Sequence, residues 1–199
     1  MQMIGILGGV ASGKSLVASQ LVELGAGLLD ADRAGHEALR LPKVEDAARH
    51  RWGQRVFDSD GRIDRERLAQ IVFTDSPQGS VEREYLEQLT HPEIGRLLRE
   101  QTARLADDGC VAVVLDAPLL LEVGWDRFCN MLIMVDSPRR LRLARALARG
   151  WTMEEFTTRE DAQESLDLKR ERADVIIDNS GSPEQTRAQV EHFWCSHVG

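Results

Sequence analysis

The segment from Gly8 to Ser15 constrains the fold more than any other part of the chain. It reads Gly-Gly-Val-Ala-Ser-Gly-Lys-Ser and matches the pattern G-x-x-x-x-G-K-[ST] at every fixed position. A short apolar run, residues 3–7, precedes it, and apolar residues at helical spacing follow it up to Gly25. A strand, a glycine-rich turn and a helix in this order indicate a loop that binds phosphate through backbone N–H groups, rather than a bare turn.

Each fixed position of this loop has a physical reason. Gly8 and Gly13 permit backbone angles and close approaches that a side chain would forbid. Lys14 brings a mobile positive charge to the β and γ phosphates of a nucleotide, and the Ser15 hydroxyl is suited to coordinate Mg²⁺. The expected ATP-binding residues are Gly8, Gly9, Val10, Ala11, Ser12, Gly13, Lys14, Ser15 and Leu16.

Four further apolar runs predict the other strands of a parallel sheet. They cover residues 27–30, 111–115, 130–135 and 174–177, and helical stretches separate them. Continuous β-branched runs such as 111–115 are expected where helices cover both faces of a sheet. The predicted fold class is therefore α/β, a parallel sheet flanked by helices of the P-loop nucleoside triphosphate hydrolase type.

Two helical segments interrupt this alternation. Residues 33–109 contain no strong strand and predict helices at 64–73, 81–89 and 92–105. Residues 137–172 are highly charged and rich in arginine. We expect one domain over residues 1–199, with a core of 1–32, 110–136 and 173–199, a helical substrate-side insertion at 33–109 and a lid at 137–172.

Composition excludes several classes of protein. The 199 residues include 25 Lys and Arg against 33 Asp and Glu, a net charge of −8, which disfavours a general coat for nucleic acid or an anionic membrane. No run approaches the ~20 apolar residues that span a bilayer. The apolar start reads as a buried strand and not as a signal peptide. The 3 cysteines, Cys110, Cys129 and Cys195, lack the spacing of a disulfide framework or zinc site. We therefore expect a cytoplasmic protein, a monomer or small homo-oligomer, without nucleic-acid or membrane partners.

Three aspartates follow predicted strands. Asp116 comes directly after the run 111–115, where a carboxylate supports Mg²⁺ in many loops of this kind; the alternative is that Asp suits the following turn. Asp30 and Asp32 lie at the end of the second strand, and alternation along a strand predicts that only one of them faces the cleft. That carboxylate could orient an acceptor hydroxyl and take its proton, or it could cap a helix starting at Arg33.

Two features of the helical segments are open to more than one interpretation. Arg145 and Arg149 are one helical turn apart and could clamp a γ-phosphate, although arginine-rich helices are also common as solvated faces. His91, before Pro92, could contact a substrate phosphate or cap the next helix. The cysteines and the 4 tryptophans are interpreted as packing residues.

The chain lacks the Asn-Lys-x-Asp element expected of a guanine-specific GTPase, and it is short for a motor or transport ATPase. A compact core with a helical insertion and an arginine-rich lid favours a small-molecule kinase, because a lid excludes water that would compete as phosphoryl acceptor.

Six segments in order resemble the dephospho-coenzyme A kinase family. They are the loop Gly8–Ser15, Asp30-Ala31-Asp32 with His36, Gly61-Arg62-Ile63-Asp64-Arg65, Thr90-His91-Pro92-Glu93-Ile94, the run from Asp116 to Glu122, and the run from Ala173 to Gly181. Only the loop is specific when taken alone, but the order of all six covers nearly the whole chain.

The resemblance implies Mg²⁺-dependent transfer of the ATP γ-phosphate to the ribose 3′-hydroxyl of dephospho-CoA, the final step of CoA biosynthesis. By the same resemblance Asp32, Lys14, Arg145 and Arg149 are catalytic, and Ser15 and Asp116 serve the metal. Arg159 and Gln163 match an R-x-x-x-Q element of the lid, and the register of Arg145 and Arg149 is defined to about one position. The implied substrate-binding residues are Asp32, His36, Arg65, His91, Pro118 and Leu119.

This sequence also departs from the family. Leu7 replaces a threonine, and Ala11 replaces a glycine of the loop, so we expect ordinary backbone angles at residue 11. Two other functions stay open: a nucleotide-binding switch or regulatory module without phosphoryl transfer, and a kinase for another alcohol such as a nucleoside. The acceptor-side motifs favour a dephospho-CoA kinase over both, because a switch has no use for them.

Overall fold

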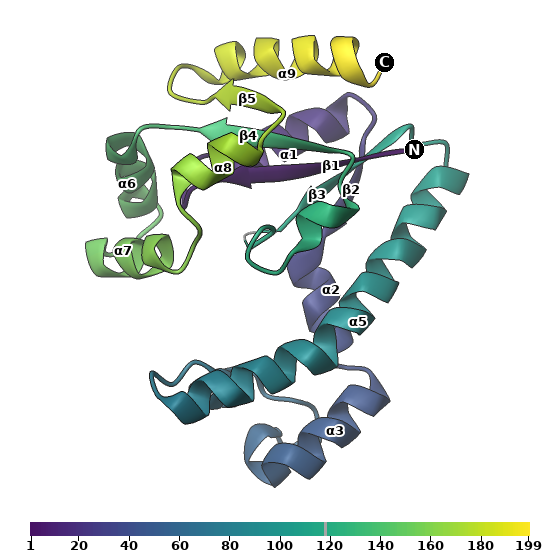
Figure 1. The fold of residues 1–199 in the computed structure, drawn as a ribbon, viewed down its shortest axis with the longest axis vertical. Helices are drawn as coiled ribbons and strands as arrows, with labels where there is room; N and C mark the ends of the chain where they lie inside the picture. The colour runs from purple at the N-terminus through teal and green to yellow at the C-terminus, as the bar shows by residue number, and fades with distance from the viewer. Residues whose placement is uncertain (118) are drawn as a thin grey trace. The chain divides into compact units, whose positions relative to one another are not determined.

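The computed structural model describes residues 1–117 and 119–199. Its strands form one parallel sheet in the order β2-β3-β1-β4-β5, which confirms the predicted fold class (Figure 1). Each predicted strand is present to within about one residue at each end. The strands are β1 (Gln2–Gly8), β2 (Gly27–Asp30), β3 (Ala112–Asp116), β4 (Met131–Asp136) and β5 (Val175–Asp178).

The register brings the carboxyl ends of the strands to one edge. Asp30 of β2 pairs with Asp116 of β3, and Asp136 of β4 pairs with Asp178 of β5. The loop that follows β1 leaves the sheet at this same edge, because Gly8 lies beside Val135 of β4. Open α/β sheets bind their ligands at this edge.

One face of the sheet packs against α1 and α9. Ile4 and Ile6 of β1 are fully buried and share a core cluster with Leu21 of α1 and with Val190 and Phe193 of α9. Residues of β3 and β4 alternate onto both faces and are almost all buried. This explains why these strands read as continuous apolar runs in the sequence.

The helices follow the sequence patterns with one exception. The predicted helices at 81–89 and 92–105 are wrong as separate elements, because one helix, α5, runs from Pro77 to Asp107 with Pro92 inside it. Proline removes one backbone donor and crowds the carbonyl of the preceding turn, which is why the sequence predicted a break there. The helices are α1 (Lys14–Glu23), α2 (Ala31–Ala38), α3 (Pro42–Trp52), α4 (Arg65–Val72), α5 (Pro77–Asp107), α6 (Arg139–Ala148), α7 (Met153–Asp161), α8 (Leu166–Arg172) and α9 (Pro183–His197), with short 3₁₀ helices at Gly53–Val56 and Trp125–Phe128.

The chain forms two compact units. The first, residues 1–30 and 102–199, holds the sheet, α1 and α6 to α9. The second, residues 31–101, holds α2, α3, α4 and most of α5. The division predicted from the sequence, with an insertion at 33–109 and a lid at 137–172, stays a prediction beside these limits.

The second unit has its own core. Trp52, Val56, Phe57, Leu68 and Val72 are buried together. At its centre Glu82 of α5 accepts hydrogen bonds from Trp52 Nε1 at 2.8 Å and from Arg51 Nε at 2.9 Å. The helix α4 begins where Asp64 accepts hydrogen bonds from the backbone N–H groups of Glu66 and Arg67, as a capping residue does.

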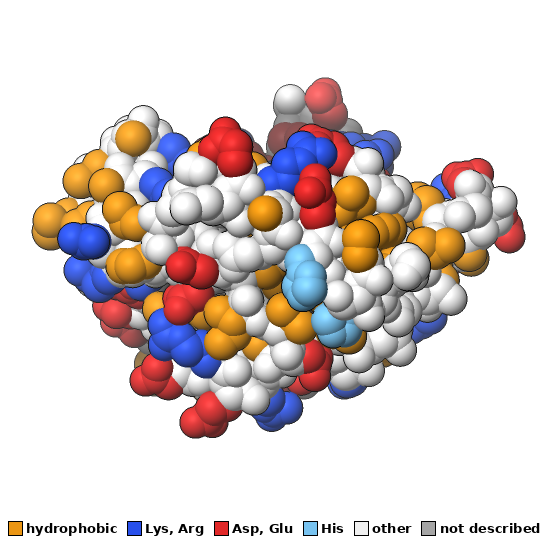
Figure 2. All heavy atoms as spheres, turned by 90° about the horizontal axis from the view of Figure 1, so that it is seen from above, with side chains coloured by type: hydrophobic (Ala, Val, Ile, Leu, Met, Phe, Trp, Pro, Cys, Tyr) orange, Lys and Arg blue, Asp and Glu red, His pale blue; other side chains and the backbone are white. Residues whose placement is uncertain are grey.

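Within the described residues, no helix is long and apolar enough to cross a membrane. On the face seen from the α9 side, acidic, basic and apolar side chains are intermixed, and positive charge does not gather into one patch (Figure 2). The three cysteines are free thiols. Burial raises the pKa of the Cys129 thiol to about 12, so this thiol stays protonated and inert near neutral pH.

Candidate active site

The loop between β1 and α1 requires glycine at the positions that the sequence pattern marks. A side chain at Gly8 would meet Ser12 Oγ at 2.6 Å and the Val135 carbonyl oxygen at 2.7 Å. Gly13 has a φ of +104°, and a side chain there would overlap the side-chain amide of Asn179. The backbone of this loop can therefore approach a ligand closely, as a phosphate cradle must.

Ala11 contradicts the expectation of ordinary backbone angles. Its φ is +56°, in the left-handed region, and no other non-glycine residue among those described has a positive φ. The Cβ of an alanine crowds the following carbonyl oxygen in this conformation. The loop keeps its glycine-like path at residue 11 although the residue has a side chain, so this position stores strain.

Lys14 points back into the loop. Its Nζ donates to the carbonyl oxygens of Gly8 and Gly9, both at 3.1 Å. Burial lowers the pKa of Lys14 to about 8, while the negative charge of Asp116 acts in the opposite direction. The ammonium thus occupies the space inside the cradle and has lost much of its hydration, which favours its exchange onto a polyanion.

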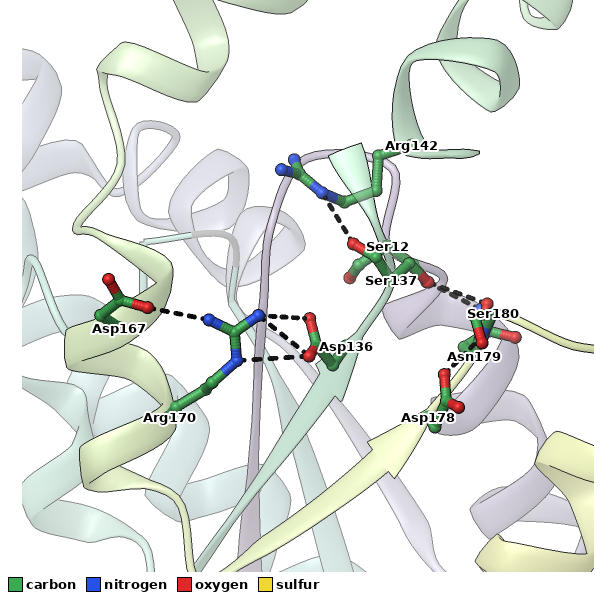
Figure 3. Close-up of polar contacts among 9 residues, drawn as sticks. All are labelled: Ser12, Asp136, Ser137, Arg142, Asp167, Arg170, Asp178, Asn179 and Ser180. Atoms are coloured by element: carbon green, nitrogen blue, oxygen red, sulfur yellow. Dashed lines mark hydrogen bonds and ion pairs between the residues drawn. The ribbon is translucent and has the colours of Figure 1, made fainter. Parts of the chain in front are cut away.

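Three donors hold the carbonyl oxygen of Ser12 at the turn of the loop. It accepts from Asn179 Nδ2 at 2.7 Å, from Ser137 Oγ at 3.1 Å and from Arg145 Nη1 at 3.1 Å. Figure 3 shows Asn179 and Ser137 converging on this residue from the ends of β5 and β4. The Ser12 hydroxyl, by contrast, is buried and has no hydrogen-bond partner among the described residues. A buried orphan hydroxyl in this loop fits a phosphate oxygen as its missing partner.

The arginines of the segment predicted as a lid have different surroundings. Arg145 of α6 also donates to Ser137 Oγ and to the Asn179 carbonyl oxygen, so it braces the loop from the outside. Arg149 ends α6 and is exposed. Arg159 of α7 stacks over the Trp151 ring at 4.3 Å.

Sequence reasoning missed Arg142, which is almost fully buried over the loop. Its Nη1 donates to the Val10 carbonyl oxygen at 3.3 Å. Its Nε donates to the Ser137 carbonyl oxygen at 3.2 Å (Figure 3). Glu160 of α7 holds the third nitrogen at 2.7 Å. The sequence feature that could have indicated Arg142 is its spacing, one helical turn before Arg145.

The segment predicted as a lid contributes α6 and α7, which pack directly on the loop. Val10 is buried in a cluster with Ala146 of α6 and Phe156 of α7, and Ala11 and Trp151 pack against them. Figure 1 shows α6, α7 and α8 at the side of the sheet where β1 ends. A change in the path of residues 10 and 11 is therefore felt by both lid helices.

The carboxylates at the strand ends have different partners. Asp136 binds Arg170 of α8 through both oxygens, at 3.0 to 3.2 Å, and Asp178 accepts from the Ser180 backbone N–H (Figure 3). Asp116 is half-buried at the end of β3, where its charge reaches Lys14.

A magnesium ion bound here would need ligands from both the protein and the nucleotide. Ser15 is exposed in the first turn of α1, and hydroxyl and carboxylate oxygens such as those of Ser15 and Asp116 suit Mg²⁺. In the part of the chain that the structure describes, no three His, Cys, Asp or Glu side chains form a metal cluster. The residues therefore fit an ion whose other ligands are phosphate oxygens and water.

Asp32 lies in a helix, which overturns the alternation argument. The strand β2 ends at Asp30 and α2 begins at Ala31, so Asp32 belongs to the first helical turn. The two aspartates do not alternate along one strand, and Asp32 does not precede the helix as a cap. A carboxylate in a first turn is favoured by the helix dipole.

The second unit contains a cavity of about 480 Å³ with a cationic lining. It brings together His36 and Arg65, which the sequence analysis selected from two separate motifs. Arg40 and Arg62 supply further positive charge, and Asp58 is the acidic residue among the lining. The lining residues are His36, Leu39, Arg40, Asp58, Arg62, Ile63 and Arg65.

The other predicted acceptor-side residues are placed less decisively. His91 lies inside α5 and not at the start of a helix, so the alternative role as a cap is wrong. Leu119 is half-buried in the turn after β3. Pro118 lies outside the described residues.

Comparison with known proteins shows the family of this chain. A model of the dephospho-CoA kinase family matches residues 2–185. The dephospho-CoA kinase of Symbiobacterium thermophilum is 42% identical, over all of this chain and 82% of its own length. That of Aquifex aeolicus is 37% identical, over 98% of this chain and 96% of its own length.

Solved structures agree. A Thermus thermophilus protein superimposes with a TM-score of 0.85 and 34% identity, over 100% of this chain and 98% of its own. The dephospho-CoA kinase of Campylobacter jejuni has a TM-score of 0.65 at 22% identity, over 99% of this chain and 97% of its own, which shows a shared fold. Because the family model matches residues 2–185 and the relatives match nearly the whole chain, this chain belongs to the dephospho-CoA kinase family.

Proposed function

We propose that this protein transfers the γ-phosphoryl group of ATP to the ribose 3′-hydroxyl of dephospho-CoA and releases CoA and ADP. The observation that supports this most strongly is the loop Gly8–Ser15, with Lys14 turned into it, in a chain that matches the family model over residues 2–185. Family membership supplies the acceptor, and the loop supplies the donor site.

The first unit binds ATP. The loop amides and Lys14 surround the phosphates, and the Ser12 hydroxyl gains the partner that it lacks. When bound, Mg²⁺ neutralises charge on the β and γ phosphates, with Ser15 and Asp116 on its protein side. Lys14 exchanges its two carbonyl acceptors for phosphate oxygens, which stabilises the negative charge of the transferring group.

Asp32 acts on the acceptor. Its carboxylate holds the 3′-hydroxyl in line with the γ-phosphorus and takes the proton as the new ester bond forms. His36, Arg65, His91, Pro118 and Leu119 bind the rest of dephospho-CoA. The cationic lining around His36 and Arg65 supports this role, because the acceptor contains a pyrophosphate.

The lid excludes water and supplies cations. Arg145 and Arg149 are assigned to the transferring phosphate. Arg145 must release donors from the loop carbonyls to reach it, whereas Arg149 is exposed and available. The protein is expected to work in the cytoplasm as a monomer or small homo-oligomer, without nucleic acid or membrane.

A coupled ADP-release assay with product identification tests the function. Purified protein with ATP, Mg²⁺ and dephospho-CoA is expected to form CoA, and Lys14→Ala is expected to lose turnover by a factor of 10² or more, the scale of one lost electrostatic contact. Lys43→Ala, an exposed lysine of the second unit, is the matched control and is expected to keep full activity.

Two results would contradict the proposal. ATP binding without CoA formation would favour a regulatory switch. Faster turnover with a nucleoside such as adenosine than with dephospho-CoA would favour a different small-molecule kinase.

A further inference from the structure

Lys169 is a buried cation that the proposed mechanism does not use. It lies on α8 with 2% of its side chain exposed. Its Nζ donates to Gln163 Oε1 at 3.2 Å and lies 3.3 Å from Glu122 Oε1. An ammonium has three N–H donors, and the described residues provide acceptors for two of them. Burying an ammonium group is costly unless its charge is paired and its N–H donors are hydrogen-bonded.

The position of Lys169 links it to the phosphate loop. Lys169 and Glu122 border a void too small to admit a water molecule, together with Gly8, the first residue of the loop, and Ala117. Lys14 donates to the Gly8 carbonyl oxygen, so two lysines, one on α1 and one on α8, lie beside the first residue of the loop.

Only one of the two oxygens of the Glu122 carboxylate faces Lys169. Its Oε1 accepts from the Glu164 backbone N–H at 2.7 Å and faces the lysine. Its Oε2 is buried and has no hydrogen-bond partner among the described residues. A buried carboxylate that leaves one oxygen unsatisfied is a poor structural brace. It fits a counter-ion that holds a cation ready for another anion.

We propose that Lys169 is a second phosphate-binding cation of this site, and that Glu122 and Gln163 hold it beside the loop. The ligand is the polyphosphate of a nucleoside triphosphate. The inference uses the proposed function only in that ATP binds at the loop; it does not depend on the identity of the acceptor. Like charges near each other in a partly dehydrated site are relieved when a polyanion binds, so both lysines gain from the same event.

The alternative is a purely structural ion pair that ties α8 to the segment after β3. The two interpretations predict different responses to removal of each partner. A structural pair is lost equally from either side. A phosphate-binding lysine with a competing carboxylate gives opposite effects, because removing Glu122 takes away the anion that competes with phosphate.

The test is ATP affinity by calorimetry for a pair of isosteric variants. Lys169→Gln is expected to weaken ATP binding at least tenfold. Glu122→Gln is expected to leave ATP binding unchanged or to tighten it. Arg172→Gln removes an exposed cation of the same helix, paired with Asp126 at 3.6 Å, and is expected to bind ATP as the wild type does.

Equal weakening by Lys169→Gln and Glu122→Gln would overturn the proposal, and so would wild-type affinity in Lys169→Gln. Because each single change leaves a buried group without its partner, the double variant Lys169→Gln/Glu122→Gln is measured as well. Its two amides can hydrogen-bond each other, so it is expected to melt near the wild type and still bind ATP at least tenfold more weakly. A double variant with wild-type affinity would overturn the proposal even if the single variants do not fold.

The binding assay separates this inference from the proposed function. It contains no acceptor, so a protein that binds ATP in a Lys169-dependent manner but makes no CoA contradicts only the proposed function. A protein that makes CoA with unchanged ATP affinity in Lys169→Gln contradicts only this inference.

Discussion

At the scale of single residues, the loop residues and Asp32 differ in what holds them in place. Lys14 and the Ser12 carbonyl are held by named partners before any ligand binds. Asp32 is placed by its helix, in the first turn of α2, where the dipole favours the charged carboxylate. The loop residues assigned to the nucleotide are therefore fixed by contacts within the first unit, whereas Asp32 is positioned by the start of α2.

Asp32→Asn keeps the shape of the side chain and removes its charge and its ability to take a proton. We expect kcat to fall by roughly 10²-fold or more, the scale of a general base, with ATP affinity within twofold of the wild type. Asp30→Asn, at the end of β2, is the matched control and is expected to change kcat less. Near-wild-type turnover of Asp32→Asn together with a lower melting temperature would assign Asp32 to the stability of α2.

Ala11→Gly is expected to stabilise the protein. Glycine adopts a φ of +56° without the steric cost that alanine meets, and this gain exceeds the extra freedom of glycine in the unfolded chain. We expect the free energy of unfolding, measured in urea, to rise by roughly 1 kcal/mol. Ala18→Gly, in the interior of α1, is the control and should lower it by about the same amount. Loss of stability in Ala11→Gly would show that the methyl contact with the lid outweighs the strain.

At the scale of elements, a charged group that is buried holds α5 against α3. Hydrogen bonds from Arg51, Trp52 and Gln78 converge on Glu82, which is 7% exposed. The Arg51 hydrogen bond is the largest influence that lowers the pKa of Glu82 to about 2, against the opposing effect of burial.

Glu82 makes the stability of the second unit depend on pH. Between its ordinary pKa near 4.5 and its folded pKa of about 2, the unfolded chain binds more protons than the folded one. The stabilisation is therefore complete above about pH 5 and is lost as the pH falls toward 2. Glu82→Gln is expected to cost about 2 kcal/mol at pH 7, with a smaller difference from wild type at pH 3. Glu84→Gln, exposed on the same helix, is the control without this pH dependence, and a constant difference for Glu82→Gln would refute the assignment.

At the scale of the whole molecule, the residues assigned to ATP and most of those assigned to dephospho-CoA lie in different compact units. The residues assigned to ATP lie in the first unit, and His36 and Arg65 line a cavity within the second. Each unit also has its own buried core, which allows a ligand to stabilise one without the other.

Hydrogen exchange with each ligand alone tests this division. ATP is expected to slow exchange in residues 8–16 and in the lid helices α6 to α8, because the lid packs on Val10. Dephospho-CoA is expected to slow exchange around α2 and residues 58–65. Protection by dephospho-CoA confined to the first unit would contradict the assignment of His36 and Arg65, and Lys14→Ala with ATP provides the control for loop-specific protection.

The sequence by itself determined the features that depend on neighbours along the chain. Strands of buried apolar residues, the glycines of the loop and the lysine that follows them are dictated by local backbone sterics and periodicity, and all were predicted to within about one residue. The continuous α5 and the left-handed Ala11 were not, because a proline and an alanine have local preferences that surrounding contacts overrode. The tertiary structure alone decided which cations reach the loop. Arg142 contacts Val10, 132 positions away, while Arg149, just after the end of the same helix, is exposed. Lys169 meets Glu122 only because α8 packs beside the segment after β3. Residue type and spacing cannot separate these arginines and lysines, since long side chains of like charge differ only in where the fold buries them.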